Sequence, residues 1–351
     1  MKTAVIGPTL HTYYGIEEIA KYCDIKALFT LPLKQGLRKA RYATFEDQAD
    51  KYGFEIFHDE HNLDDSKVTK RFRDLDLDLI IELGSSKIIP AEIIESSRYG
   101  CIGSHGAKLP YIRGGASMNW AIINGENEWG VSIFYLTPGI DEGILISTAN
   151  FDINNQDTIN TVHDKSDYAT MRMLGEFLNN FKPKEEFEHQ ELEIIKLNPS
   201  PKDADFTKIM EWNEYIKSKY KEYKSSNKRN AIFLPQRKPQ DGIINWNSQA
   251  REIYNFIRAQ TGPYFPGAFT MYKGKKLFVL DSELDFFLSV NHSRYKPGTI
   301  IDILDNIGIL VKTSYDYLRL TRVRLEGMPE MWADDFFHEA TLKAGDIIYD
   351  F

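Results

Sequence analysis

The chain has 351 residues, more than a typical single domain, and 42% of them are hydrophobic, so the sequence predicts two domains with a sizeable core. A formal net charge of −8 argues against general binding to phosphate backbones or anionic membranes. The two cysteines, Cys23 and Cys101, match no disulfide framework and no zinc motif. Because no apolar run reaches about 18 residues and no signal sequence is visible, a cytoplasmic protein with no membrane partner is expected.

The first half of the chain alternates short apolar runs with segments of helical periodicity. Strands are expected at residues 2–7, 24–30 and 77–84, and helices at residues 15–22, 43–53 and 90–100. Residues 129–139 form the next expected strand, and residues 144–153 are expected to pair back on it. This alternation predicts an α/β fold with an open, mostly parallel, Rossmann-like sheet.

The second half of the chain changes in character. Residues 217–229 hold six basic residues and one acid, which favours a solvated helix face and linker, although contact with a nucleic acid or a phosphorylated ligand stays open. One helix at residues 248–260 is then followed by several short strands, which predict a smaller β-barrel-like, OB-like domain. The expected boundaries are a first domain at 1–195, a connection at 196–230 and a second domain at 231–351.

Two polar residues stand in segments that are expected to lie at the carboxyl edge of the parallel sheet, where ligands bind. His105 lies in the glycine-rich stretch 100–115, which is expected to be a loop, and Asp141 lies in a glycine-flanked turn about 36 residues later. An aspartate that orients an imidazole makes a general acid or base near neutral pH. From spacing alone, the alternative that each residue caps a turn or a helix stays open.

Seven segments carry a resemblance to a known family: "HGAKLPYIRG" (105–114), "NWAIINGE" (119–126), "GIDEG" (139–143), "PQRKPQDGIINW" (235–246), "IRAQTGPYFPGAF" (257–269), "KPGTI" (296–300) and "VRLEGMPEM" (323–331). In order and spacing they resemble the folate-dependent formyltransferases, whose members include methionyl-tRNA formyltransferases and amino-sugar N-formyltransferases. The resemblance covers nearly the whole chain. It implies a formyltransferase fold for the first domain and N10-formyltetrahydrofolate as the formyl donor for a substrate amine.

The resemblance also implies catalytic residues. His105 and Asp141 match the histidine and the aspartate that assist proton transfer in the family. The asparagine that stabilises the oxyanion belongs two residues before the histidine, where this chain has Gly103. Ser104, Asn119 or a backbone N–H group is expected to substitute for that asparagine. Two alternatives stay open: chemistry with a different one-carbon donor or acyl group, and an inactive member that still binds ligand.

Binding residues follow from the same resemblance. Two segments match those that hold the pterin ring of the folate, chiefly through backbone groups: Ser85, Ser86, Lys87, Ile88 and Ile89, and Pro138, Gly139 and Ile140. Arg113 and Gly114 are expected either to contact the substrate or to shape a turn, and His11 lies where a substrate loop is expected. The histidines show no metal-ligand spacing, so no metal is expected.

The acceptor is expected to be a nucleotide-linked amino sugar, as in the synthesis of a surface polysaccharide. Residues 231–351 hold 14 Lys and Arg against 15 Asp and Glu, a net charge of −1, which disfavours the transfer RNA that the alternative, a methionyl-tRNA formyltransferase, would bind. A homodimer is also expected. The aromatic-rich stretches "GPYFPGAF" (262–269) and "EMWADDFF" (330–337) could supply its interface or belong to the core.

Overall fold

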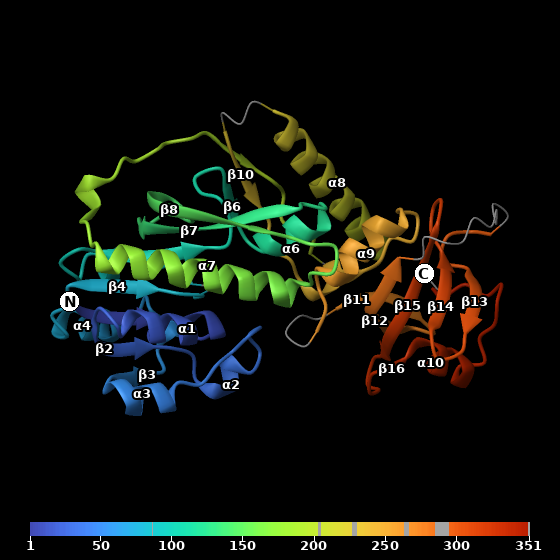
Figure 1. Ribbon diagram of the computed structural model, residues 1–351, viewed down its shortest axis with the longest axis horizontal. Coiled ribbons are helices and arrows are strands. Elements are labelled where there is room, and N and C mark those ends of the chain that lie inside the picture. Colours follow the sequence, from blue (N-terminus) through green and yellow to red (C-terminus); the bar gives the residue numbers. More distant parts are fainter. Residues whose placement is uncertain (86, 203–204, 227–229, 263–266, 285–294, 350–351) are drawn as a thin grey trace.

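The computed structural model describes residues 1–85, 87–202, 205–226, 230–262, 267–284 and 295–349. The chain forms an α/β unit at one end and an antiparallel β unit at the other, with two helices between them (Figure 1). The predicted fold class is confirmed by this arrangement. No helix among the described residues is both long and apolar enough to cross a membrane.

The α/β unit is built on a seven-stranded sheet with the order β3-β2-β1-β4-β5-β7-β8. The first five strands of this order pair in parallel, β7 pairs antiparallel with β5, and β8 pairs antiparallel with β7, as expected for residues 144–153. The central strands are apolar on both faces because helices cover both sides. The strands are β1 (Lys2–Ile6), β2 (Asp24–Phe29), β3 (Glu55–Phe57), β4 (Leu79–Glu82), β5 (Cys101–His105), β7 (Glu128–Leu136) and β8 (Gly143–Asp152).

Helices pack on both faces of this sheet. On one face, α1 (Leu10–Ile19) and α7 (Ile159–Asn179) lie side by side and share a core with Val5 (Figure 1). On the other face, α4 (Ser66–Asp74) and α5 (Ala91–Ile94) pack with Ala4, the neighbour of Val5 in β1. Alternate strand residues thus serve opposite faces. The shorter helices of this unit are α2 (Leu33–Gly36), α3 (Glu46–Tyr52), η1 (Glu60–Asn62) and η2 (Lys184–Glu186).

Two expectations for this unit are wrong. The helix expected at 90–100 is only the single turn α5, and beyond its end Ser97 donates its hydroxyl proton to the carbonyl of Gly100 at 2.7 Å. The stretch 100–115, expected to be a loop, begins with the buried strand β5. Its backbone pairs with β4 on one side and with β7 on the other, and this pairing overrides the weak strand tendency of its glycines.

A second sheet has three parallel strands, the first of which, β6 (Ile112–Gly114), comes after β5 in the chain. Its order is β6-β10-β9, from β6, β10 (Ala231–Leu234) and β9 (Ile194–Lys196). Strand β10 stands within the range expected for the second domain, yet it pairs with strands from before residue 197. The domain boundaries at 195 and 231 stay predictions.

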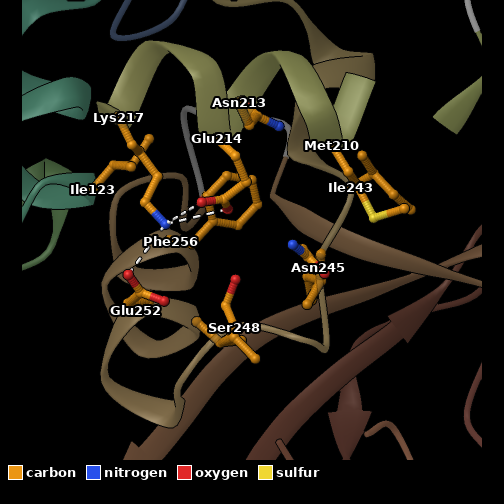
Figure 2. A pocket seen from close by; sticks show the side chains of 12 residues that line it. Ile123, Met210, Asn213, Glu214, Lys217, Ile243, Asn245, Ser248, Glu252 and Phe256 are labelled. Carbon is orange, nitrogen blue, oxygen red and sulfur yellow. Dashed lines mark hydrogen bonds and ion pairs between the residues drawn. The ribbon is translucent and has the colours of Figure 1, made fainter. Parts of the chain in front are cut away.

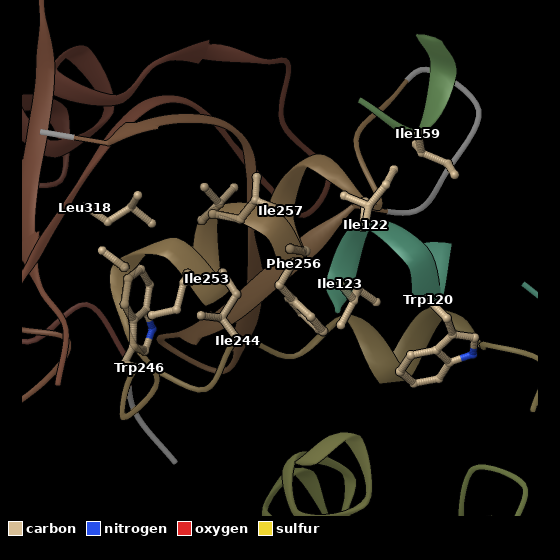
Figure 3. Close-up of a cluster of buried hydrophobic side chains, with 14 of the residues drawn as sticks. Trp120, Ile122, Ile123, Ile159, Ile244, Trp246, Ile253, Phe256, Ile257 and Leu318 are labelled. Carbon is tan, nitrogen blue, oxygen red and sulfur yellow. The ribbon is translucent and has the colours of Figure 1, made fainter. Parts of the chain in front are cut away.

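A hydrophobic cluster joins the two ends of the molecule. Figure 3 shows Trp120 and Ile123 of α6 (Ser117–Ile123) near Phe256 of α9 (Ala250–Arg258), with Trp246 and Leu318 farther along the same cluster. The long helix α8 (Phe206–Ser225) contributes Trp212 and Tyr220 to it, and η3 (Pro239–Gly242) follows β10. This cluster therefore packs α6, α8 and α9 against the strands of the C-terminal unit.

The C-terminal unit is a six-stranded sheet in which every pair formed by the described residues is antiparallel. Of the aromatic stretches considered for a dimer interface, Tyr264 and Phe265 lie outside the described residues, whereas Phe336 and Phe337 are buried in the core. The homodimer stays a prediction. The elements are β11 (Ala268–Tyr272), β12 (Lys275–Leu284), β13 (Ile300–Leu304), β14 (Gly308–Lys312), β15 (Tyr317–Leu325), β16 (Met331–Trp332) and the helix α10 (Ala333–Glu339).

Candidate active site

Two cavities adjoin at the carboxyl ends of β4 and β5. The His105 cavity, of about 670 Å³, extends from His105 to the 137–141 turn. The His11 cavity, of about 290 Å³, extends from His11 toward α7. Four residues line both cavities: Glu82, Ser85, Ser104 and Gln236. Cavities of this size at the carboxyl edge of a parallel sheet are typical of small-molecule sites.

His105 and Asp141 meet in the first cavity. His105 is the last residue of β5 and is 9% exposed, and its Nδ1 lies 3.3 Å from Oδ1 of Asp141. The other carboxylate oxygen of Asp141 accepts the N–H group of Gly114 at 2.7 Å. Among the described residues, no atom forms a hydrogen bond with the buried Nε2 of His105. This nitrogen can therefore exchange a proton with a molecule in the cavity, as a general base requires.

The residues predicted to hold the folate line the same cavity. They are Ser85, Lys87, Ile88 and Ile89 from the segment after β4, and Gly139 and Ile140 from the 137–141 turn. Pro138 precedes Gly139 in that turn, and Ser86 lies outside the described residues. The size of the cavity and the unpartnered Nε2 of His105 both fit a bound ligand, so these residues could hold a folate. Among the described residues, no group of three or more His, Cys, Asp or Glu could hold a metal ion.

The second cavity brings His11 and Ser104 together. Nε2 of His11 lies 2.7 Å from the hydroxyl oxygen of Ser104, and its Nδ1 lies 2.6 Å from Oδ1 of Asp167 on α7. Arg41 donates to Oδ2 of Asp167 at 2.5 Å. The three groups have the connectivity of a Ser–His–Asp triad. Asp167 and Arg41 carry no signal in the sequence, because Asp167 lies 156 residues from His11 and only the packing of α7 on α1 joins them.

The surroundings of Asp167 and His163 in the second cavity shift the pKa of each group. Burial alone would raise the pKa of Asp167, but the hydrogen bond from His11 and the charges of His11 and Arg41 hold it below its ordinary value. Burial and the charge of Arg41 lower the pKa of His163 to about 4, so this ring is neutral at pH 7. The second cavity is therefore lined by the carboxylate of Asp167, the guanidinium of Arg41 and the neutral ring of His163.

Three further predicted residues have roles within the fold. Asn119 lines the His11 cavity and donates its amide to the carbonyl of Ala259 at 2.7 Å. The buried Arg113 donates from Nε to the carbonyl of Pro110 at 3.2 Å, which matches the turn-shaping alternative. Gly114 lines the His105 cavity and supplies the N–H group that Asp141 accepts.

Glu82, which sequence analysis passed over as a strand residue, stands beside Gly103. The two residues pair across β4 and β5, and a Cβ atom on Gly103 would lie 2.9 Å from Oε2 of Glu82 and 2.5 Å from Cδ1 of Leu136. Oε1 of Glu82 accepts the N–H group of Ser85 at 2.6 Å. Burial, assisted by the nearby charge of Asp141, raises the pKa of Glu82 to about 8, so this carboxyl group is protonated at pH 7.

Replacing Glu82 by glutamine is expected to stabilise the protein more at pH 8 than at pH 5. Between its ordinary pKa of 4.5 and the folded value of about 8, Glu82 keeps a proton in the folded chain that the unfolded chain releases. This group therefore lowers the free energy of unfolding by up to about 1.4 kcal/mol for each pH unit in that window. Glutamine does not titrate. Urea unfolding of both proteins at pH 5, 6.5 and 8 measures the difference, and a difference independent of pH would contradict the protonated state.

Comparisons with known proteins agree on one family. A family model described as "Formyl transferase" matches residues 25–178, and one described as "Formyl transferase, C-terminal domain" matches residues 237–341. A methionyl-tRNA formyltransferase from Fusobacterium nucleatum subsp. nucleatum is 28% identical over 349 residues, which cover 99% of this chain and 99% of that protein. Another, from Caldicellulosiruptor saccharolyticus, is 30% identical over 271 residues, which cover 77% of this chain and 74% of that protein.

Solved structures share the fold at lower sequence identity. HypX from Aquifex aeolicus in complex with tetrahydrofolic acid superposes with a TM-score of 0.57 at 14% identity, covering 97% of this chain and 47% of that one. This chain thus spans about half the length of HypX. The N-formyltransferase from Helicobacter canadensis, in complex with folinic acid and dTDP-3-aminofucose, gives a TM-score of 0.52 at 14% identity and covers 91% of this chain and 99% of that one.

Proposed function

Because this chain belongs to the formyl transferase family and is a folate-dependent formyltransferase, we propose that its acceptor is the amine of a nucleotide-linked amino sugar. The observation that carries the catalytic part of the proposal is the buried, unpartnered Nε2 of His105 beside Asp141. N10-formyltetrahydrofolate, bound in the His105 cavity, supplies the formyl group. Sugars of this kind are used to build surface polysaccharides.

His105 and Asp141 move the proton in this proposal. Asp141 holds the proton of the His105 ring on Nδ1, which leaves the lone pair of the unpartnered Nε2 able to accept a proton. Nε2 then accepts the proton that the acceptor amine loses as its nitrogen bonds to the formyl carbon. Gly114 fixes Asp141 in this orientation through its N–H group. The acceptor amine reaches the formyl group from the His11 cavity, whose lining adjoins the His105 cavity at Ser104 and Glu82.

The ion pairs of three lysines in α8 support a small acceptor over a nucleic acid. Figure 2 shows Lys217 between Glu214 and Glu252, at 3.0 and 3.4 Å. Lys219 pairs with Glu222 at 2.8 Å, and Lys224 pairs with Glu126 at 2.9 Å. A surface that holds RNA phosphates needs basic side chains that are free to replace counterions, whereas these three lysines already have carboxylate partners.

Methionyl-tRNA is the second candidate acceptor. The observation in its favour is that a methionyl-tRNA formyltransferase aligns with this chain over 99% of both proteins. Enzymes that neutralise several phosphates bind RNA with a steep dependence on salt, whereas the binding of one nucleotide-linked sugar involves two phosphate groups and a shallow dependence. The two candidates are thus separable by rate and by salt response.

Formylation assays with both acceptors test the proposal. The purified chain receives N10-formyltetrahydrofolate with either dTDP-3-aminofucose and related nucleotide-linked amino sugars or methionyl-tRNA, and mass spectrometry follows the gain of a formyl group. A faster rate with an amino sugar is expected, with kcat/KM changing less than about tenfold between 50 and 200 mM salt. A higher kcat/KM for methionyl-tRNA, falling steeply with salt, would reject the amino-sugar assignment and favour the second candidate.

A further inference from the structure

Formyl transfer demands a hydrogen-bond donor that position 103 cannot supply. As the amine bonds to the formyl carbon, negative charge develops on the formyl oxygen, and a preorganised donor at about 2.7–3.1 Å from that oxygen stabilises it. Gly103 lies two residues before His105 on β5, so both residues face the same side of the sheet. A side chain at position 103 would point toward the reacting group, and glycine leaves that position without a donor.

We propose that the carboxylic acid of Glu82 donates this hydrogen bond, from the space beside Gly103 that a side chain there would otherwise occupy. The inference rests on the proposed formyl transfer. Glu82 pairs directly with Gly103, and its Oε2 lies 2.9 Å from the position of a Cβ atom on Gly103. Glu82 also lines the His105 cavity together with His105 and Asp141. Glu82 thus occupies, together with Leu136, the space that a side chain at position 103 would need.

The two carboxyl oxygens of Glu82 differ in what they contact. Oε1 accepts the N–H group of Ser85 at 2.6 Å, so this oxygen is fixed as an acceptor. The proton of the neutral acid therefore belongs on Oε2, the oxygen next to Gly103. The hydroxyl of Ser104, by contrast, already lies 2.7 Å from Nε2 of His11.

The groups around Glu82 favour its neutral form. Asp141, from the turn after β7, and Glu60, from η1, both raise its pKa by their charge, while Lys39 and the N–H group of Ser85 lower it. Burial is the largest effect and brings the pKa to about 8. Burial lowers the pKa of Lys39 and raises that of Cys101 on β5, so burial disfavours the charged form of each of these neighbours as well. A neutral carboxylic acid held in a site of this kind is an established type of oxyanion donor.

Glu82 keeps its proton throughout the reaction. The bond from the amine nitrogen to the formyl carbon forms, and the bond from that carbon to N10 of the folate breaks. His105 takes one proton from the amine, and the same proton is returned to N10. Glu82 contributes only a hydrogen bond that strengthens as the charge develops, so a neutral amide at position 82 is able to replace it, whereas a methyl group is not.

Four variants test the inference, with N10-formyltetrahydrofolate and the acceptor turned over fastest in the assays above. Glu82→Ala is expected to lose about 100- to 1,000-fold in kcat, and Glu82→Gln to stay within about tenfold of the unmodified chain. In the unmodified chain, kcat is expected to fall above pH 8 as the carboxyl group of Glu82 ionises. This fall should be absent from Glu82→Gln, because glutamine does not titrate. Gly103→Asn alone should lose activity because its side chain meets Glu82, whereas Gly103→Asn combined with Glu82→Ala should recover at least about tenfold over Glu82→Ala, since the amide then donates instead.

Controls separate a failed inference from a failed function or a failed fold. Asp281→Asn removes another carboxyl group with a raised pKa, in β12 of the C-terminal unit, and should leave kcat and its pH profile unchanged. Circular dichroism and calorimetric binding of 5-formyltetrahydrofolate verify that each variant is folded. Equal kcat in Glu82→Ala and the unmodified chain would overturn the inference. Glu82→Gln as slow as Glu82→Ala would also overturn it, in favour of proton transfer by Glu82. An unmodified chain that formylates no acceptor would instead reject the proposed function.

Discussion

Replacing His105 by alanine is expected to lower kcat for formyl transfer by about 100- to 10,000-fold, while the affinity for folate changes by no more than a few-fold. The reason is that Nε2 of His105 is buried, has no partner among the described residues and belongs to a ring whose other nitrogen faces Asp141. Without it, the attacking amine has no group to which it can pass its proton. Single-turnover transfer measures the rate, and calorimetry with 5-formyltetrahydrofolate measures binding.

A matched histidine on the surface provides the control. His338 in α10 also contacts a carboxylate, Asp305 at 2.8 Å, but it is exposed in the C-terminal unit. Its replacement by alanine should leave kcat unchanged. If His105→Ala kept more than about a tenth of the original kcat, proton transfer would have to proceed through another group. The Ser104–His11 pair of the neighbouring cavity would then be the next to test.

The fold was largely predictable because its signals are local. Apolar runs and helical periodicity indicated β1, β2, β4, β7 and β8, and the C-terminal strands were found between their turn residues. Strand β5 was the main error. Its sequence CIGSH has a glycine at its centre and reads as a flexible connection, yet the strand is specified by partners on both sides, β4 and β7, that lie 20 or more residues away. Local propensity carries no information about such partners.

The candidate site was predictable only in part. The resemblance to the family pointed to His105 and Asp141, and the structure brings the two together at 3.3 Å. The resemblance did not indicate Asp167, which contacts His11 only because α7 packs on α1. It did not indicate Glu82 either, because Glu82 has the sequence context of a buried strand residue. The sequence shows that Gly103 replaces the asparagine of the family. It does not show that Glu82 lies beside Gly103, because only the pairing register of β4 and β5 brings these two residues together.

In the proposed mechanism the two cavities have different tasks. The His105 cavity holds the predicted folate residues together with His105 and Asp141, and the His11 cavity holds Asp167 and Arg41. Glu82 and Ser104 line both, so they stand where donor and acceptor would meet. A change that alters acceptor choice is therefore expected in the second cavity, and a change that alters the chemical step in the first.

Replacing Asp141 by asparagine is expected to lower kcat by about 100- to 10,000-fold with little change in folding, because the substitution inverts the tautomer of His105. Oδ1 of Asp141 lies 3.3 Å from Nδ1, and in the proposed mechanism it keeps the ring proton there, whereas an amide N–H group would donate to Nδ1 and drive the proton onto Nε2. An Nε2 that already carries a proton cannot accept one from the amine.

The tautomer is directly measurable, which distinguishes this mechanism from a general disturbance of the turn. Nitrogen-15 chemical shifts of the His105 ring should report protonated Nδ1 in the unmodified chain and protonated Nε2 in Asp141→Asn at pH 8. Glu142→Gln, a change of the neighbouring exposed carboxylate, should alter neither the tautomer nor kcat. The amide oxygen of asparagine can still accept the N–H group of Gly114, so the left-handed backbone of residue 141, with φ of +52°, is expected to persist. An unchanged tautomer together with a large loss of kcat would mean that the charge of Asp141, not its orientation of the ring, drives the reaction.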